Sequence, residues 1–371
     1  MKEKKSVLYI TNIPSPYSVN FLNELGKLCN LTAIFERYDS SERDKSWKEF
    51  RFETFKGIIL KGWKVGADAS IDFQIVKYLN RRYDAIIVSN PCTPTGMIAI
   101  TYMKLMRIKY GIASEGGMAK NGLGVKEKIK KFLFSNAEVY FSTGWKGDEY
   151  FVTYGANQDK IKWFPYTTLY REDILPHTLS VNEKEKYKIS VGCQNKRMIL
   201  SIGRFIPGKG MDVLMKAFQK IEGDIELVIV GGTPPEEYIL LQKQLNIHNI
   251  RFVDFSNKEG LINYYKAADI FVLPTRSDTW GLVIPEAMSF GLPVISTDQC
   301  VAALSLIRND KNGYIVPVEN VNELKSKICA ILENDNLSNL MAEENLKSMQ
   351  DYSVEKMAQC VFYGLKLLDN E

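Results

Sequence analysis

The sequence predicts an α/β protein built from two parallel-sheet domains. Its 371 residues are enough for two domains, each with its own hydrophobic core. Short apolar, partly β-branched runs alternate with segments of helical periodicity, first from Val7–Ile10 and again from Met198–Ile202. This alternation is typical of parallel sheets covered by helices. Because no short-period repeat is present, the two halves are interpreted as two separate sheets.

The first half alternates strands and helices as far as residue 164. Its polar segment 36–55 carries charges of both signs, and is interpreted as a solvated loop or short surface helix. Alternatively it is an acceptor-side loop, because loops at the carboxyl ends of strands carry specificity. The expected strands are 7–10, 31–35, 57–60, 85–88, 110–113, 139–142 and 161–164, and the expected helices are 19–28, 73–79, 96–106, 124–134 and 148–154.

The second half repeats the pattern and ends in a helix at 353–368. Pro285 suits the first turn of a helix, where its missing N–H is not needed, and Gly291 and Pro293 end that helix. The expected strands are 198–202, 226–230, 252–253, 270–273 and 293–296, and the other expected helices are 211–220 and 259–268.

A loop and a helix start follow the strand 270–273. Two acids flank this stretch, Asp278 on the loop and Glu286 in the first helical turn, and Gly281 between them allows a close backbone approach. Ligands of open α/β sheets bind at the carboxyl ends of strands, and a helix N-terminus favours phosphate. The stretch 267–296 therefore predicts a ligand site, although each acid alone also fits a helix cap or a surface position.

A second loop brings two fixed cations after the strand 198–202. Gly203-Arg204 and Lys209-Gly210 lie five positions apart, with glycines beside them. Arginine offers a bidentate fork and lysine a point charge, so together they can hold a diphosphate from two sides. The alternative is a solvated basic loop.

The composition excludes several other classes of protein. A net charge of +4 argues against an extended nucleic-acid surface. The six cysteines are scattered without a Cys-x-x-Cys pair, and only His177 and His248 are present, so reduced thiols are expected rather than disulfides or a histidine-rich metal centre. No signal peptide and no apolar run of about 20 residues is present. We therefore expect a cytoplasmic protein.

The segment from Asp278 to Ile295 resembles the acidic-x7-Glu motif of the retaining glycosyltransferases of family 4, or glycosyl transferases group 1. The resemblance is to members that build bacterial cell-surface polysaccharides. It departs at Asp278, where the family usually has Glu, and this places the sugar contact in question. The family has the GT-B fold, in which two Rossmann-like domains face each other across a cleft and a C-terminal helix crosses back.

The resemblance assigns roles to the candidate residues. It implies that Arg204 and Lys209 hold the diphosphate of a UDP-linked sugar and stabilise the leaving group, that Asp278 faces the sugar and that Glu286 holds the ribose hydroxyls. Glu115 follows the strand 110–113 and is the candidate for a family position near the reacting sugar, where a histidine is absent here. A solvated turn is its alternative. The other donor-site candidates are Gly203, Gly281, Leu282, Val283, Ser256, Lys258 and Leu261.

The family pattern also suggests domain boundaries and cofactor needs. Pro165-Tyr166 resembles the interdomain hinge. We expect a first domain at 1–172, joined by the helix 353–371, a linker at 173–187 and a donor-binding domain at 188–352. No Asp-x-Asp motif is present, so the diphosphate is expected to need no metal, and no cofactor is expected.

The acceptor is expected to be a glycan or a lipid-linked saccharide. In the helix 124–134, lysines between Lys126 and Lys131 lie beside apolar residues that gather on one face, as on a surface helix or on a helix that lies on an anionic membrane. Three other functions stay open: a non-catalytic nucleotide-sugar-binding protein, a GT-B sugar-nucleotide epimerase, whose catalytic acids and histidines are not placed, and a nicotinamide dehydrogenase, whose GxGxxG is missing.

Overall fold

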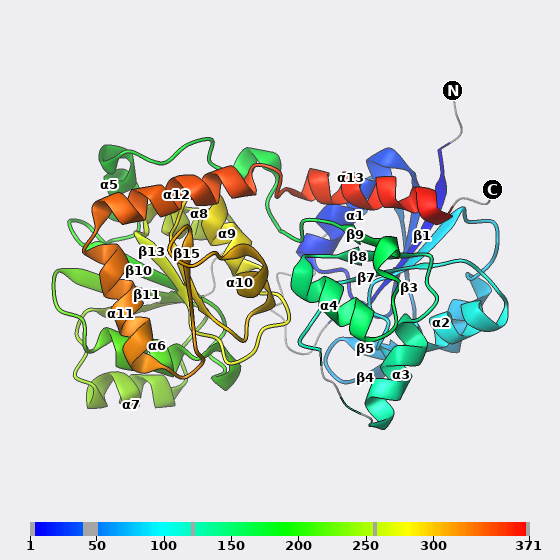
Figure 1. The fold of residues 1–371 in the computed structure, drawn as a ribbon, viewed down its shortest axis with the longest axis horizontal. Helices are drawn as coiled ribbons and strands as arrows, with labels where there is room; N and C mark the ends of the chain where they lie inside the picture. Colours follow the sequence, from blue (N-terminus) through cyan, green and yellow to red (C-terminus); the bar gives the residue numbers. More distant parts are fainter. Residues whose placement is uncertain (1–3, 40–50, 120–121, 123, 255–257, 369–371) are drawn as a thin grey trace. The chain divides into compact units, whose positions relative to one another are not determined.

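The computed structural model describes residues 4–39, 51–119, 122, 124–254 and 258–368. The chain divides into two compact units. The first consists of Met1–Thr168 together with Ser353–Glu371, and the second of Leu169–Tyr352. Each unit contains a parallel sheet, and this confirms the predicted fold class (Figure 1).

The sheet of the first unit has seven strands among the described residues, in the order β3-β2-β1-β6-β7-β8-β9. All neighbours pair in parallel. The strands are β1 (Ser6–Thr11), β2 (Asn30–Phe35), β3 (Lys56–Ile59), β6 (Ala85–Val88), β7 (Gly111–Ser114), β8 (Val139–Ser142) and β9 (Ile161–Trp163).

Helices cover both faces of this sheet. One core cluster joins alternate strand residues to α2 (Pro94–Leu105), α3 (Val125–Phe134) and α4 (Trp145–Thr153). The other face packs against α1 (Pro16–Leu28), whose Phe21 meets Tyr9 edge to face, and against the C-terminal helix. In Figure 1 that helix, α13 (Val354–Gly364), lies along α1, and its residues belong to the first unit.

The second unit has a six-stranded parallel sheet among the described residues, in the order β12-β11-β10-β13-β14-β15. Most apolar side chains of these strands are buried, as expected for a sheet covered on both faces, whereas Phe252, Val253 and Ile315 on the two edge strands are half-buried. The strands are β10 (Arg197–Ile202), β11 (Ile225–Val230), β12 (Ile250–Val253), β13 (Ile270–Leu273), β14 (Val294–Thr297) and β15 (Gly313–Val316).

The helices of the second unit form a layer on each side of its sheet (Figure 1). The layer beside one core cluster consists of α6 (Met211–Phe218), α7 (Glu236–Gln244) and α11 (Val321–Leu332). The opposite layer contains α5 (Val181–Ser190), α8 (Lys258–Ala267), α9 (Val283–Ser289) and α12 (Asp335–Met349), and α10 (Val301–Leu306) follows β14.

Several elements differ from the sequence-based expectations. The helix expected at 73–79 is a 3₁₀ helix, η2 (Phe73–Lys77). The sequence patterns missed a short antiparallel hairpin of β4 (Trp63–Val65) and β5 (Ala69–Ile71). Residues 173–187, expected as a linker, lie within the second unit and include most of α5, which packs on α8. A Ser180–Glu183 capping box starts α5, so a segment that looked only charged forms a helix.

Candidate functional site

The second sheet reverses its strand order between β10 and β13, which lie side by side. Their carboxyl ends lead into the loops 203–210 and 274–282. A reversal of strand order is the place where open α/β sheets bind ligands, because the two loops diverge there. The two stretches that the sequence singled out therefore meet at the topological switch point of this unit.

Hydrogen bonds lock these two loops together. The Arg276 amide and the Thr275 hydroxyl both donate to the Gly208 carbonyl at 2.8 Å. The Arg276 guanidinium binds both carboxylate oxygens of Asp212 at 2.9 Å, and it also binds Glu319. These carboxylates raise the pKa of Arg276. The Arg276 side chain therefore holds the loop 274–282 against the first turn of α6 through its two hydrogen bonds to Asp212.

Gly210 allows the close contact between the loops. Its φ is +67°, and a Cβ built on it would lie 2.0 Å from the Pro274 carbonyl oxygen. Any other residue would separate the two loops. Gly210 follows the short 3₁₀ turn η5 (Pro207–Lys209), so its position determines where Lys209 leaves the backbone.

Lys209 and Asp278 form an ion pair at this point. The Lys209 ammonium donates to Asp278 Oδ2 at 2.5 Å, and the two side chains are only 22% and 14% exposed. The backbone of Asp278 is fixed on both sides, since its amide donates to the Gln299 carbonyl and its carbonyl accepts from the Val301 amide. Both residues were predicted from the sequence, but for different parts of the ligand, and their contact was not predicted.

Gly281 lies beside this pair with a φ of +94°. A Cβ there would lie 2.8 Å from Cys300 Sγ and 3.5 Å from Asp278 Oδ2. Burial, with a smaller contribution from Asp278, raises the pKa of Cys300 to about 12, so this thiol stays protonated and acts as packing. The positive φ and the close approach to Cys300 Sγ therefore require a glycine at position 281.

Glu286 lies on α9, the helix that follows this loop. The helix starts at Val283 rather than at Pro285, Leu282 is its N-cap, and no side chain of the described residues caps it. Glu286 is half-buried. Its Oε2 accepts a hydrogen bond at 2.8 Å from the hydroxyl of Tyr265, a buried residue of α8 that the sequence analysis did not select.

Arg204 is exposed on the loop that follows β10. The loop backbone is anchored there, because the Gly203 amide donates to the Val230 carbonyl at 2.9 Å. A Cβ on Gly231 would lie 1.9 Å from the Gly203 carbonyl oxygen. The structure thus fixes the backbone next to Arg204 against the end of β11.

Three other donor-site candidates, Ser256, Lys258 and Leu261, follow β12 in the sequence. Ser256 is outside the described residues. Lys258 at the start of α8 pairs with the Asp173 carboxylate and lies over the Tyr170 ring, 5.0 Å from its centroid. Leu261 is half-buried on the same helix. The structure therefore places Lys258 against the segment before α5.

Glu115 belongs to the first unit, where it follows β7 at the carboxyl edge of the sheet, one strand away from the reversal of strand order between β1 and β6. A cavity of about 100 Å³ there is lined by polar side chains, among them Asn12, Asn90 and Glu115. The Tyr166 hydroxyl bonds to the Glu115 carboxylate, and burial together with that charge raises the pKa of Tyr166. The Thr143 hydroxyl donates to the Glu115 carbonyl at 3.1 Å. Glu115 is therefore built into a polar cavity rather than a solvated turn.

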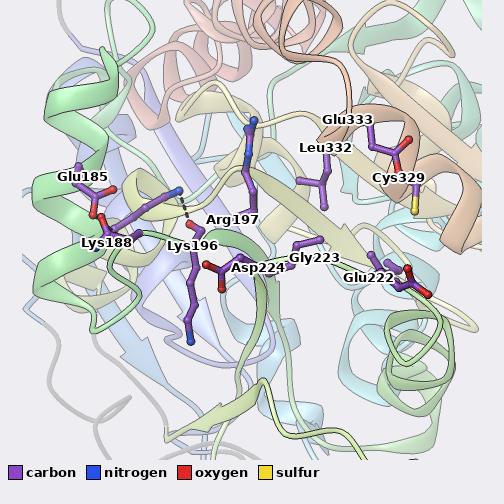
Figure 2. A pocket seen from close by; sticks show the side chains of 13 residues that line it. Glu185, Lys188, Lys196, Arg197, Glu222, Gly223, Asp224, Cys329, Leu332 and Glu333 are labelled. Atoms are coloured by element: carbon purple, nitrogen blue, oxygen red, sulfur yellow. Dashed lines mark hydrogen bonds between the residues drawn. The ribbon is translucent and has the colours of Figure 1, made fainter.

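A pocket of the second unit lies at the amino edge of its sheet, opposite the loops that carry Lys209 and Asp278. Its volume is about 450 Å³, and it surrounds the amino ends of β10 and β11 near Arg197 and Asp224 (Figure 2). Lys188 points to the Lys196 carbonyl there and pairs with the buried Asp269 at 2.7 Å. None of the predicted site residues lines this pocket. Among the described residues, no group of three or more His, Cys, Asp or Glu side chains could hold a metal ion.

Helix α3 exposes apolar side chains to solvent. Val125, Ile129 and Phe132 are 74%, 40% and 49% exposed, whereas Leu133 and Phe134 are buried. At 100° per residue the three exposed residues form one stripe along the helix. The lysines divide as well: Lys130 lies over the Tyr150 and Tyr154 rings, and the exposed ones are Lys126, Lys128 and Lys131. No helix among the described residues combines the length and the apolarity needed to cross a bilayer.

The second unit is similar in sequence to known glycosyltransferases. Residues 183–348, within the second unit, match the family model described as Glycosyl transferases group 1. An uncharacterized glycosyltransferase of Haemophilus influenzae is 30% identical over 168 residues, which are 44% of this chain and 47% of that protein. An N-acetylgalactosamine-N,N'-diacetylbacillosaminyl-diphospho-undecaprenol 4-alpha-N-acetylgalactosaminyltransferase of Campylobacter jejuni is 29% identical over 143 residues, 38% of this chain and 39% of that protein. The chain therefore spans about half the length of these relatives or less.

Solved structures extend the likeness over the whole chain. Anabaena Alr3699/HepE in complex with UDP and glucose superposes with a TM-score of 0.74 at 14% identity, covering 97% of this chain and 99% of that one. At this identity the likeness shows the fold, which is GT-B with two parallel-sheet α/β domains. The sequence likeness to the glycosyl transferases group 1 thus lies in the second unit.

Proposed function

We propose that this chain transfers a sugar from a nucleotide diphosphate sugar, UDP-linked, to a glycan or lipid-linked saccharide acceptor in cell-surface polysaccharide synthesis. The observation that carries the proposal is the ion pair between Lys209 and Asp278, held at 2.5 Å at the topological switch point of the second sheet. A partly buried cation beside an acid suits a ligand that carries both a diphosphate and sugar hydroxyls.

The reaction breaks the bond between the anomeric carbon and the diphosphate oxygen. Negative charge grows on that oxygen, and the fixed Lys209 ammonium, with Arg204 on the same loop, is proposed to stabilise it. A diphosphate that binds Lys209 competes with Asp278 for the ammonium. Donor binding would then release the Asp278 carboxylate for the sugar hydroxyls. Two protein cations replace the charge that a metal ion would supply, so we propose a metal-independent reaction.

The anomeric configuration is proposed to be retained. In a front-face reaction the acceptor oxygen forms the new glycosidic bond on the side from which the diphosphate leaves, and the leaving phosphate oxygen takes the acceptor proton. Glu115 is proposed to act on the acceptor side, since it lies in a polar cavity of the first unit. Trapping a covalent glycosyl-enzyme on Asp278 or Glu115 would contradict this mechanism.

The choice of donor and acceptor draws on the similar proteins. Anabaena Alr3699/HepE is described in complex with UDP and glucose, and the Campylobacter jejuni relative is named for an undecaprenol-linked substrate. We propose the corresponding classes here: a UDP-sugar, with a hexose or N-acetylhexosamine as the transferred sugar, and an acceptor that carries a lipid.

A lipid-linked acceptor would bring the enzyme to a membrane. The exposed stripe of Val125, Ile129 and Phe132, with exposed lysines beside it, is proposed to lie on the surface of an anionic bilayer. Changing the four lysines between 126 and 131 to glutamate should abolish sedimentation with vesicles that contain phosphatidylglycerol. Unchanged binding would remove the membrane from the proposal.

The experiment that tests the proposed function is a thermal-shift screen with UDP, GDP and ADP and their sugars, with EDTA or with Mg²⁺. A ligand at about 100 times its dissociation constant stabilises the folded state by roughly 2.7 kcal/mol. Stabilisation by one nucleotide diphosphate that EDTA does not reduce, followed by sugar transfer, would support the enzyme. Stabilisation without turnover would favour a nucleotide-sugar-binding protein, and no shift with any nucleotide would contradict the donor site.

A further inference from the structure

A buried tyrosine holds the carboxylate of Glu286. Tyr265 on α8 is 2% exposed, and its hydroxyl donates to Glu286 Oε2 at 2.8 Å. The two residues come from different helices, which precede and follow β13. The contact therefore joins two helices of one layer.

The ring of Tyr265 is fixed by its neighbours. It stacks on Phe290 with centroids 5.2 Å apart and planes 7° from parallel, and Phe271 packs against it at 6.0 Å. A ring clamped in this way has little freedom to move its hydroxyl. Burial, and then the charge of Glu286, raises the pKa of Tyr265 well above its ordinary value, so the hydroxyl keeps its proton and remains a donor.

The backbone under Glu286 is also rigid. Pro285 precedes it, and the Ile284 amide donates to the Gly281 carbonyl at 2.9 Å. What remains variable is the rotamer of a glutamate, which has three side-chain torsions. A donor at a fixed point selects among those rotamers, and a phenylalanine at position 265 would fill the same space without doing so.

We propose that Tyr265 is a positioning residue that fixes the Glu286 carboxylate for the two hydroxyls of a donor ribose. The proposal rests on the proposed function and on the ribose contact that the family resemblance implies for Glu286. A carboxylate accepts hydrogen bonds from both hydroxyls of a vicinal diol only in a narrow range of orientations. Tyr265 acts on the ligand only through Glu286, so its effect depends on the presence of the ribose hydroxyls.

This dependence gives a selective experiment. Affinities are measured by calorimetry for UDP, GDP and ADP and for their 2′,3′-dideoxy analogues, on the full chain and on Tyr265→Phe. Wild-type protein should prefer one ribonucleotide over its dideoxy analogue. In Tyr265→Phe the dissociation constant for that ribonucleotide should rise about tenfold, the effect of one hydrogen bond to a charged group. The dissociation constant for the dideoxy analogue should stay within twofold of wild type.

Two further variants separate positioning from a structural role. Tyr238→Phe, another buried tyrosine of this unit that packs on Phe205, should leave both affinities unchanged. Glu286→Gln should reduce the preference for ribose, and adding Tyr265→Phe to it should change little more, because both act on one contact.

The outcomes distinguish this proposal from the proposed function. If Tyr265→Phe weakens both nucleotides equally, or neither, the positioning role is refuted while the donor site stands. If wild-type protein binds a nucleotide but does not distinguish it from the dideoxy analogue, Glu286 does not hold the ribose and the proposal fails. If wild-type protein binds none of the nucleotides, the proposed function fails and this proposal fails with it.

Discussion

Replacing Lys209 with methionine removes one charge from the ion pair with Asp278 and keeps an unbranched side chain of similar length. The Lys209 ammonium touches Asp278 Oδ2 at 2.5 Å, so the substitution leaves a carboxylate that is only 14% exposed without its cation. It also removes the cation that we propose stabilises the leaving diphosphate. Stability and turnover should therefore both fall, by amounts that the structure bounds separately.

The loss of stability follows from the burial of the pair. Exposed ion pairs contribute about 0–1 kcal/mol, whereas removing one partner from a fully buried pair costs about 3–5 kcal/mol. With exposed fractions of 22% and 14% the pair lies between these limits, and we expect a loss of about 1–2 kcal/mol. For a unit of this size, 1 kcal/mol lowers Tm by roughly 2–4 °C. Turnover should fall by roughly 100- to 1,000-fold, as when one preorganised donor to a developing charge is removed.

Two assays measure these effects independently. Calorimetry without nucleotide gives Tm, and transfer from the UDP-sugar found in the thermal-shift screen gives kcat/KM. Lys220→Met is the matched control, because this exposed lysine of the same unit bonds only to the side chain of Asn322 among the contacts described. It should change neither quantity.

The reasoning is refuted if Lys209→Met turns over its substrate at the wild-type rate. It is also refuted if adding Asp278→Asn lowers Tm further, because removing the unpaired charge should restore stability. A normal Tm with no turnover would show that the pair contributes little to stability and that the cation acts on the ligand alone.

Three further predictions follow from charged groups in the two units. Asp278→Glu keeps the charge opposite Lys209 and should retain turnover with a loss below about 100-fold, the typical effect of a 1 Å misplacement; complete loss in a kinetic assay would show a site fitted to the shorter side chain. Lys188→Met should lower the unfolding free energy in urea by about 1–3 kcal/mol, because the buried Asp269 loses one cation and keeps Lys184 and the Met198 amide as partners, and adding Asp269→Asn should recover part of the loss; equal losses in both variants would contradict this. Burial raises the pKa of Glu36 from 4.5 to about 7, so the folded first unit binds this proton more tightly than the unfolded chain and should lose roughly 3 kcal/mol of stability between pH 4.5 and 7. Glu36→Gln should flatten that decline in unfolding experiments at pH 5 and 8, and an unchanged slope would refute the assignment.

The sequence by itself determined most of the strands, the architecture of two parallel sheets and the identity of several site residues, but not β4, β5 or β15. Apolar, β-branched runs of four to six residues can be stable only when buried in a sheet, and their alternation with helical patterns implies a parallel order. The positions of Pro285 and Gly291 bounded α9 to within two residues, because the proline and glycine backbones restrict where a helix starts and ends. Lys209, Asp278 and Glu286 could be selected because each lies in the loop, or in the first helical turn, that follows a strand. Parallel sheets bind ligands at these positions.

Only the tertiary structure decided which of these residues touch one another. Lys209 and Asp278 are 69 positions apart, and their contact depends on β10 and β13 being neighbours and on Gly210 lying against Pro274. In the sequence, Tyr265 cannot be distinguished from the other residues on the buried face of α8. Its hydrogen bond to Glu286 depends on how α8 and α9 pack. Helical and strand periodicities report only which face of an element is buried, whereas a hydrogen bond between elements depends on strand order and on the packing of side chains from distant parts of the chain.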